Sequence, residues 1–71
     1  MTLSMRRVFS SHISAIGYDP EERTLVVHFT DGSKVAYDGV EAGTARQVET
    51  SPSIGKALHQ FIKYKHSHRY L

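Results

Sequence analysis

Polar and hydrophobic residues alternate along three short runs in the first half of the chain, at residues 12–18, 24–30 and 33–37. The runs are rich in β-branched and aromatic residues, and the separating segments, 19–23 and 31–32, contain Asp, Pro and Gly. A period of two indicates β-strands, and separators of this kind indicate turns. The pattern therefore predicts a three-stranded antiparallel meander.

The loop of the second hairpin decides which side chains share a face of this sheet. A two-residue loop would pair Thr30 with Ser33 and would place the apolar residues of the two strands on opposite faces. A three-residue loop pairs Phe29 with Ser33 and brings the apolar residues to one face, so burial selects this register. Gly32 is then expected to adopt a positive φ in a type I turn with a G1 bulge. The residues on the shared face are Leu25, Val27, Phe29, Val35 and Tyr37.

The period changes to 3.6 residues after Gly39, which predicts two helices. The first, over 41–49, carries Thr44, Ala45 and Val48, which continue the helical spacing that begins at Val40. The second follows residues 50–53 and is capped either by Ser51, with Pro52 at the first position, or by Ser53. It has an apolar stripe that ends in a lysine stem (Ile54, Leu58, Phe61, Ile62, Lys65) and a polar face opposite (Lys56, His59, Gln60, Lys63).

The elements in order predict a β-β-β-α-α domain of the α+β class, with two layers, in which both helices cover the apolar face of the sheet. Residues 1–10 show no period and are expected to form a flexible segment, whereas 11–71 form a single domain. Ile13 and Ile16 are three residues apart, so in a regular strand their side chains point to opposite faces of the sheet. One of them therefore lies outside the core unless a β-bulge intervenes. An exposed Ile beside Val26 would form a modest apolar patch. The predicted core comprises Leu25, Val27, Phe29, Val35, Tyr37, Val48, Ile54, Leu58, Phe61 and Ile62.

The length of 71 residues allows one domain with a thin core, in which a deep catalytic cleft is hard to build. We therefore expect no enzyme, no catalytic residues and no small-molecule substrate. The absence of cysteine excludes disulfides and thiolate metal sites, and the histidines lack zinc-site spacing, so no metal or cofactor is expected. No apolar run is long enough to span a bilayer, and Arg6 and Arg7 precede no apolar segment, so we expect a cytoplasmic protein without membrane attachment.

Charge is distributed unevenly along the chain. Residues 19–49 hold all seven acids against three bases, a net charge of −4, whereas residues 50–71 hold four bases and no acid, a net charge of +4. A basic segment of this kind either contacts an anionic partner or is a solvated surface. Aromatic residues interleaved with basic ones are typical of single-stranded nucleic-acid binding. The candidate residues for binding RNA or another nucleic acid are Lys56, Lys63, Lys65, His66, His68 and Arg69, with Tyr64 or Tyr70 stacking on bases. The alternative is a protein-interaction module or homodimer that uses a sheet edge or the open sheet face.

The order of short motifs from about Ser11 to Arg69 resembles the KTSC domain, a small family found at the C-terminus of some lysyl-tRNA synthetases and as free-standing bacterial proteins. The resemblance implies no established activity, although attachment to a tRNA enzyme suggests RNA binding. The family has a central Tyr-x-Tyr pair, of which this chain keeps Tyr37 but has Val35 at the first position. Both are expected to face the helices, as packing residues. The matching positions include Ile16, Gly17, Tyr18, Gly32, Val35, Tyr37, Ser53 and Gly55.

Overall fold

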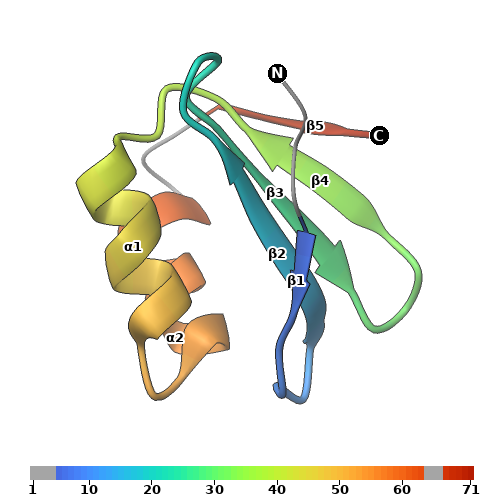
Figure 1. Cartoon of the computed structure of the whole chain (residues 1–71). Coiled ribbons are helices and arrows are strands. Elements are labelled where there is room, and N and C mark those ends of the chain that lie inside the picture. Colours follow the sequence, from blue (N-terminus) through green and yellow to red (C-terminus); the bar gives the residue numbers. More distant parts are fainter. Residues whose placement is uncertain (1–4, 64–66) are drawn as a thin grey trace.

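Antiparallel strands follow one another across a single sheet in chain order, β1-β2-β3-β4-β5, in a computed structural model of the chain (Figure 1). The structure describes residues 5–63 and 67–71, with the backbone alone at Lys63. Its strands are β1 (Met5–Arg7), β2 (Ile13–Asp19), β3 (Thr24–Phe29), β4 (Lys34–Tyr37) and β5 (His68–Tyr70). The helical elements, between β4 and β5, are α1 (Ala42–Thr50), α2 (Ile54–Leu58) and the π-helical η1 (His59–Lys63).

The central meander β2-β3-β4 confirms the predicted strands and the predicted register of the second hairpin. Leu25 pairs with Tyr37 and Val27 with Val35. The Phe29 N–H donates to the Ser33 carbonyl at 2.8 Å, which closes the three-residue loop. Gly32 has a φ of 96°, in the left-handed region that residues with a Cβ avoid. The three-residue loop is therefore the one that places the apolar residues of β3 and β4 on the same face of the sheet.

The strands β1 and β5 correct the prediction of a three-stranded sheet. Strand β1 pairs with β2, so Met5–Arg7, within the segment 1–10, belongs to the sheet. Strand β5 pairs with β4 on the opposite edge. Each is three residues long and mostly exposed, so neither shows in the sequence the alternation of apolar and polar residues that identifies a strand.

A β-bulge in β2 places the side chains of Ile13 and Ile16 on the same face of the sheet. Ile13 pairs with Phe29 and Ala15 with His28, so the intervening Ser14 is an extra residue in the strand. The Ser14 hydroxyl donates to the His28 carbonyl at 3.1 Å. Both isoleucines consequently point into the core and are fully buried, and neither joins Val26 in an exposed patch.

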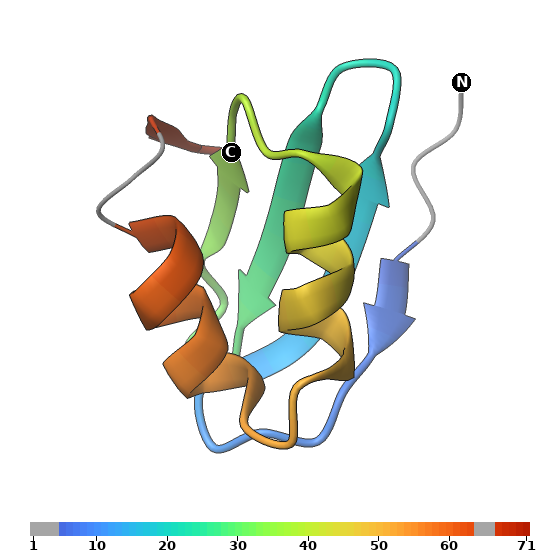
Figure 2. The ribbon, with the colours of Figure 1, turned by 90° about the vertical axis from the view of Figure 1, so that its left-hand side faces the viewer.

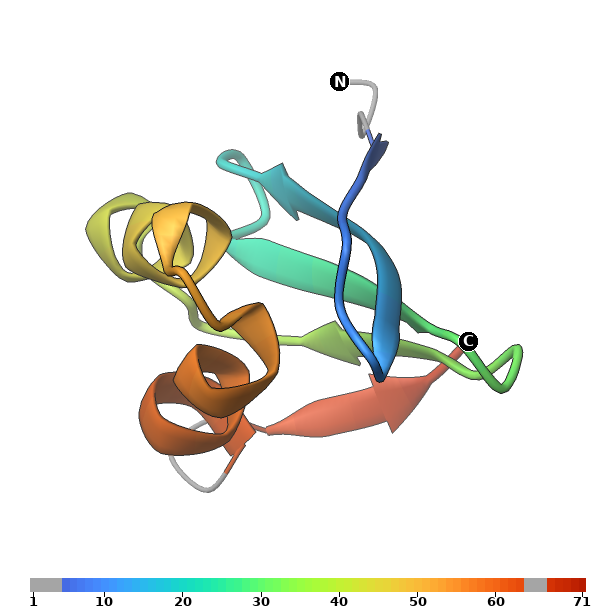
Figure 3. The same cartoon turned by 90° about the horizontal axis from the view of Figure 1, so that it is seen from below.

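The helices cover one face of the sheet, which gives the predicted two layers (Figures 1 and 3). In Figure 2, α1 lies in front of β2 and β3, while α2 and η1 lie on the side of β4. Glu41 is the N-cap of α1, and Ser53, the second of the two predicted alternatives, is the N-cap of α2. The predicted second helix widens into a π-helix at His59, a change that the apolar stripe does not reveal.

The core lies between the sheet and the helices. Seven of the ten predicted core residues are buried, whereas Phe29, Ile54 and Phe61 are only partly buried against the cluster, because they lie towards its margin. The pattern missed five further core residues: Ile13, Ile16, Val40, Ala45 and Ala57. Within the described residues, no helix is long and apolar enough to cross a membrane.

Candidate nucleic-acid interface

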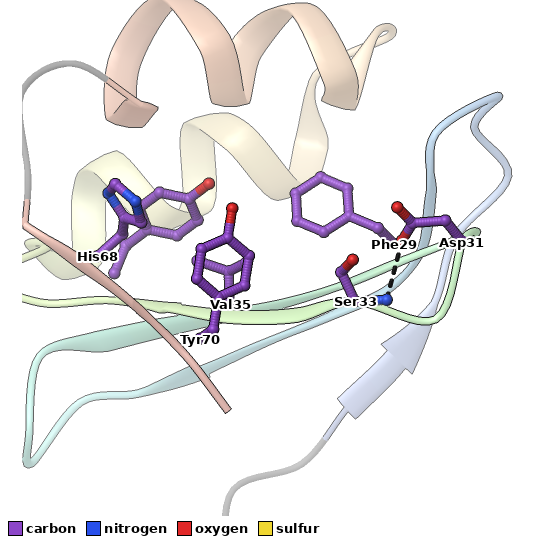
Figure 4. A pocket seen from close by; sticks show the side chains of 7 residues that line it. Phe29, Asp31, Ser33, Val35, His68 and Tyr70 are labelled. Carbon is purple, nitrogen blue, oxygen red and sulfur yellow. Dashed lines mark hydrogen bonds between the residues drawn. The ribbon is translucent and has the colours of Figure 1, made fainter.

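A pocket of about 230 Å³ lies over β4 and β5 on the face of the sheet that carries the helices, and we call it the aromatic pocket. Figure 4 shows the rings of Phe29, His68 and Tyr70 rising from the strands towards the helices, with Asp31 beside Phe29. Tyr70 is 74% exposed, so most of its ring is available to a ligand. The pocket is lined by Phe29, Asp31, Ser33, Val35, Tyr37, His68 and Tyr70.

Cross-strand pairing of β4 with β5 places three rings side by side in the aromatic pocket. Tyr37 pairs with His68, and their ring centroids lie 6.0 Å apart with planes tilted by 44°. His68 in turn lies 6.0 Å from Tyr70, edge to face. Burial, with a smaller contribution from the nearby Tyr70, raises the pKa of Tyr37, so its hydroxyl stays protonated at neutral pH. The pocket thus offers ring faces to a planar ligand.

Asp31 supplies the carboxylate of the aromatic pocket. Its Oδ1 accepts the backbone N–H of Ser33 at 2.9 Å. This bond, with a smaller contribution from the nearby Ser33 hydroxyl, lowers the pKa of the Asp31 carboxyl below its ordinary value. The side chain is therefore ionised at neutral pH and acts as a pure hydrogen-bond acceptor.

Two further hollows continue the aromatic pocket along α2. The connecting hollow, also about 230 Å³, shares Phe29 and Tyr37 with the aromatic pocket and includes His12, Ile13, Gly55, Leu58 and His59. The polar hollow, about 610 Å³, shares His12, Gly55 and His59 with it and adds Ser10, Ser11, Ser53, Lys56 and Gln60. The three hollows are neighbours that share lining residues, with hydroxyls and an ammonium group at one end of the row and aromatic rings at the other, and we call the row the groove.

The structure separates the predicted nucleic-acid-binding residues that it describes. Lys56 is exposed on α2 and lines the polar hollow, whereas His68 lines the aromatic pocket. Tyr64, Lys65 and His66 lie outside the described residues, as does the side chain of Lys63. Because η1 is π-helical, the seven-residue spacing of Lys56 and Lys63 no longer corresponds to two α-helical turns.

Arg69 alternates with His68 along β5 and therefore faces the other side of the sheet. Its Nε lies 3.5 Å from Asp38 Oδ2, with both side chains about half exposed. It lines a shallow hollow there with Leu71, Val26 and Ala36. Arg69 is thus separated from the groove by the sheet itself.

The residues that carry the family motif have structural roles in the meander. Ile16 and Gly17 are buried in β2, and the Tyr18 hydroxyl donates to the Val40 carbonyl, which ties β2 to the start of α1. Some of them also line the groove: Val35 and Tyr37 line the aromatic pocket, Ser53 lines the polar hollow, and Gly55 lines both the connecting and the polar hollow. A Cβ at position 55 would lie 3.8 Å from the Ser10 hydroxyl, an ordinary contact.

Other lining residues of the groove were not predicted from the sequence. Ser10, Ser11 and His12 precede β2, and Asp31 and Ser33 belong to a hairpin turn. The Asp-Gly dipeptide signals the turn but not its place beside β5. Across the described residues, no three His, Asp or Glu side chains gather in a way that could hold a metal ion.

The fold and the site define this protein as a two-layer α+β domain with an aromatic groove. The KTSC domain family model matches residues 9–66. The chain belongs to the KTSC domain family.

Three similar proteins extend this assignment. An uncharacterized protein of Stutzerimonas stutzeri (strain A1501) is 34% identical over 64 residues, which are 87% of this chain and 90% of the relative. A lysine–tRNA ligase of Nostoc sp. is 36% identical over 53 residues, which are 75% of this chain but only 9% of the ligase. The crystal structure of a KTSC domain protein from Yersinia pestis is similar with a TM-score of 0.95 and 30% identity over 99% of both chains.

Proposed function

We propose that this KTSC domain binds single-stranded RNA in the cytoplasm along the groove that runs from the polar hollow to the aromatic pocket. The adjacency of the three hollows carries the proposal, because it brings phosphate-binding groups and ring faces into one row. Lys56 and the serine hydroxyls suit phosphate oxygens, and Tyr70 with His68 suits stacked bases. The similarity to part of a lysine–tRNA ligase, a protein named for its action on tRNA, supports an RNA ligand.

Single-stranded RNA fits the groove better than a duplex does. Bases that are already unstacked can enter a pocket lined by aromatic rings, whereas paired bases cannot. The aromatic pocket is smaller than the roughly 300–1,000 Å³ typical of sites for drug-sized ligands, which suits one base at a time. The groove thus binds a strand through its backbone and holds a base beside β5.

Tyr70 is the residue with which to test this proposal, because its ring is exposed and its removal leaves the core intact. We expect Tyr70→Ala to weaken binding of a labelled single-stranded RNA about 5- to 150-fold, which corresponds to about 1–3 kcal/mol for one stacked base. Tyr70→Phe should bind like the unchanged protein, because stacking needs only the ring. Fluorescence anisotropy at low salt measures both affinities.

Phe9→Ala is the control, since it removes an even more exposed aromatic ring, in the loop between β1 and β2, that lines none of the three hollows. We expect this variant to keep its RNA affinity. Equal losses for Phe9→Ala and Tyr70→Ala would contradict the placement of the site. Binding of the unchanged protein no tighter than about 10⁻⁴ M at low salt would contradict RNA binding itself, since nonspecific complexes already reach that affinity.

A second candidate function is self-association at the β1 edge, and the complete exposure of Phe9 favours it. Strand β1 is an edge strand with unpaired backbone groups on its outer side, and Phe9 follows it closely in sequence. A dimer formed there would dissociate in Phe9→Ala and would be insensitive to salt, whereas RNA binding weakens steeply with salt. Sedimentation equilibrium of the two proteins separates these outcomes.

A further inference from the structure

The Asp31 carboxylate lies at the rim of a pocket whose other lining groups are mostly rings. Formation of the hairpin turn uses only part of the hydrogen-bonding capacity of the Asp31 carboxylate. Ser33 provides one hydrogen bond to the side chain, from its backbone N–H. An ionised carboxylate has about four acceptor sites, so roughly three are left for a ligand.

A carboxylate in this position discriminates between the bases. Guanine carries two adjacent N–H donors on its Watson–Crick edge, the ring N1–H and the exocyclic N2 amino group, and together they match the two oxygens of a carboxylate. Adenine, cytosine and uracil each present only one donor group on that edge. The hydroxyls of Tyr37 and Tyr70 both donate and accept, so they do not separate the bases. Discrimination therefore depends on Asp31.

Resting on the RNA binding proposed above, we propose that the aromatic pocket selects an unpaired guanine, stacked against Tyr70 and bonded through N1–H and N2–H to the Asp31 carboxylate. Figure 4 shows the Tyr70 ring and Asp31 in the same pocket, with Phe29 between them in that view. The pocket volume of about 230 Å³ suits one base. Strand recognition would then use Lys56 and the serines for affinity, and Asp31 for sequence preference.

Inosine is the most direct probe of this proposal, because its base differs from guanine only by the absence of the N2 amino group. We would measure binding of short oligouridines that carry one central guanine, inosine or adenine. We expect guanine to bind about 10-fold more tightly than inosine, in the range that one bidentate contact provides. In Asp31→Asn, guanine and inosine should bind equally. The Asn side-chain oxygen can still accept the Ser33 N–H, so the turn is retained, and circular dichroism checks this.

Glu22→Gln is the matched control, because it removes one negative charge at an exposed position on the other side of the sheet, in the hollow that holds Arg69. It should keep the preference for guanine. Binding of all oligomers with equal affinity would overturn the guanine proposal and leave RNA binding standing. Retention of the preference in Asp31→Asn would overturn the role of Asp31. The absence of binding to every oligomer would overturn both proposals.

Discussion

Tyr70 lies opposite Val35 in the pairing of β5 with β4, on the face of the sheet that carries the helices. Val35 is buried, whereas most of the Tyr70 ring is exposed. The KTSC family resemblance places the first Tyr of a Tyr-x-Tyr pair at position 35. In this chain, an aromatic ring next to Tyr37 comes from the neighbouring strand instead. The pocket thereby keeps two tyrosines on one face even though the motif in the sequence is incomplete.

At Gly32, the effect of the positive φ on stability can be measured without steric clashes, because a Cβ there would meet no atom within 4 Å. We expect Gly32→Ala to lower the free energy of unfolding by about 1–2 kcal/mol, the cost of a left-handed conformation for a residue with a Cβ. Gly43→Ala in α1, where a Cβ is equally unhindered, should raise it by about 0.5–1 kcal/mol. Urea denaturation measures both, and changes of the same sign would contradict the turn.

The bulge at Ser14 predicts an unusual tolerance to deletion. Removal of Ser14 leaves Ile13 and Ile16 two residues apart in a regular ladder, still opposite Phe29 and Val27 and on one face, so we expect the free energy of unfolding to fall only by the lost Ser14 hydrogen bond, about 0.5–1.5 kcal/mol. Ser14→Ala is the control, since it keeps the bulge and loses the same hydrogen bond to the His28 carbonyl. Thermal unfolding should give similar losses for the two variants, and a loss of about 2–5 kcal/mol in the deletion alone, as for truncation of a buried isoleucine, would contradict the bulge.

The raised pKa of Tyr37 predicts a loss of stability at alkaline pH. In the unfolded chain Tyr ionises near pH 10, whereas burial and the nearby Tyr70 keep the folded residue neutral to higher pH. The contribution is complete below about pH 10 and is lost as the pH rises through the pKa of the folded protein. Urea midpoints measured from pH 7 upwards should fall more for the unchanged protein than for Tyr37→Phe. Parallel curves would show that Tyr37 makes no difference.

The separation of Lys56 from Arg69 predicts different effects on RNA binding. Lys56→Gln should lower the slope of log affinity against log salt by about 0.7, the value for one phosphate contact on a single strand. Arg69→Gln should leave the slope unchanged, because Arg69 is on the other side of the sheet beside Asp38. A similar drop for Arg69→Gln would favour the basic surface predicted from the sequence over the groove. Neutralising Lys56, Lys63, Lys65 and Arg69 together should abolish binding in either case.

The sequence predicted the parts of the fold in which burial repeats at a regular interval. The register of β3 with β4 followed from apolar residues such as Val27 and Val35, which burial forces onto one face. Residues without that constraint were not predictable: β5 consists of exposed residues, and the spacing of Ile13 and Ile16 allowed a bulge without requiring one at Ser14. The π-helical turn at His59 was missed because an apolar stripe suits either helix.

The candidate site was less predictable than the fold. Basic residues close in sequence suggested one surface, but strand alternation turns His68 and Arg69 to opposite sides of the sheet. The aromatic pocket unites a hairpin turn at Asp31 with a strand from the far end of the chain, and no local pattern encodes that proximity. Tyr70, which local sequence suggested for stacking, does line this pocket.

The pairing of β5 with β4 has a consequence for dynamics, because two helices separate these strands along the chain. Closing such a long connection costs more entropy than closing a hairpin, and β5 adds only three exposed residues in return. Detachment of β5 is therefore a low-energy local opening, which would dismantle the aromatic pocket while the meander stays folded. A ligand held by Tyr70 would oppose that opening. The Leu71 amide, which donates to the Lys34 carbonyl at 2.9 Å, would then report occupancy of the pocket through slower hydrogen exchange.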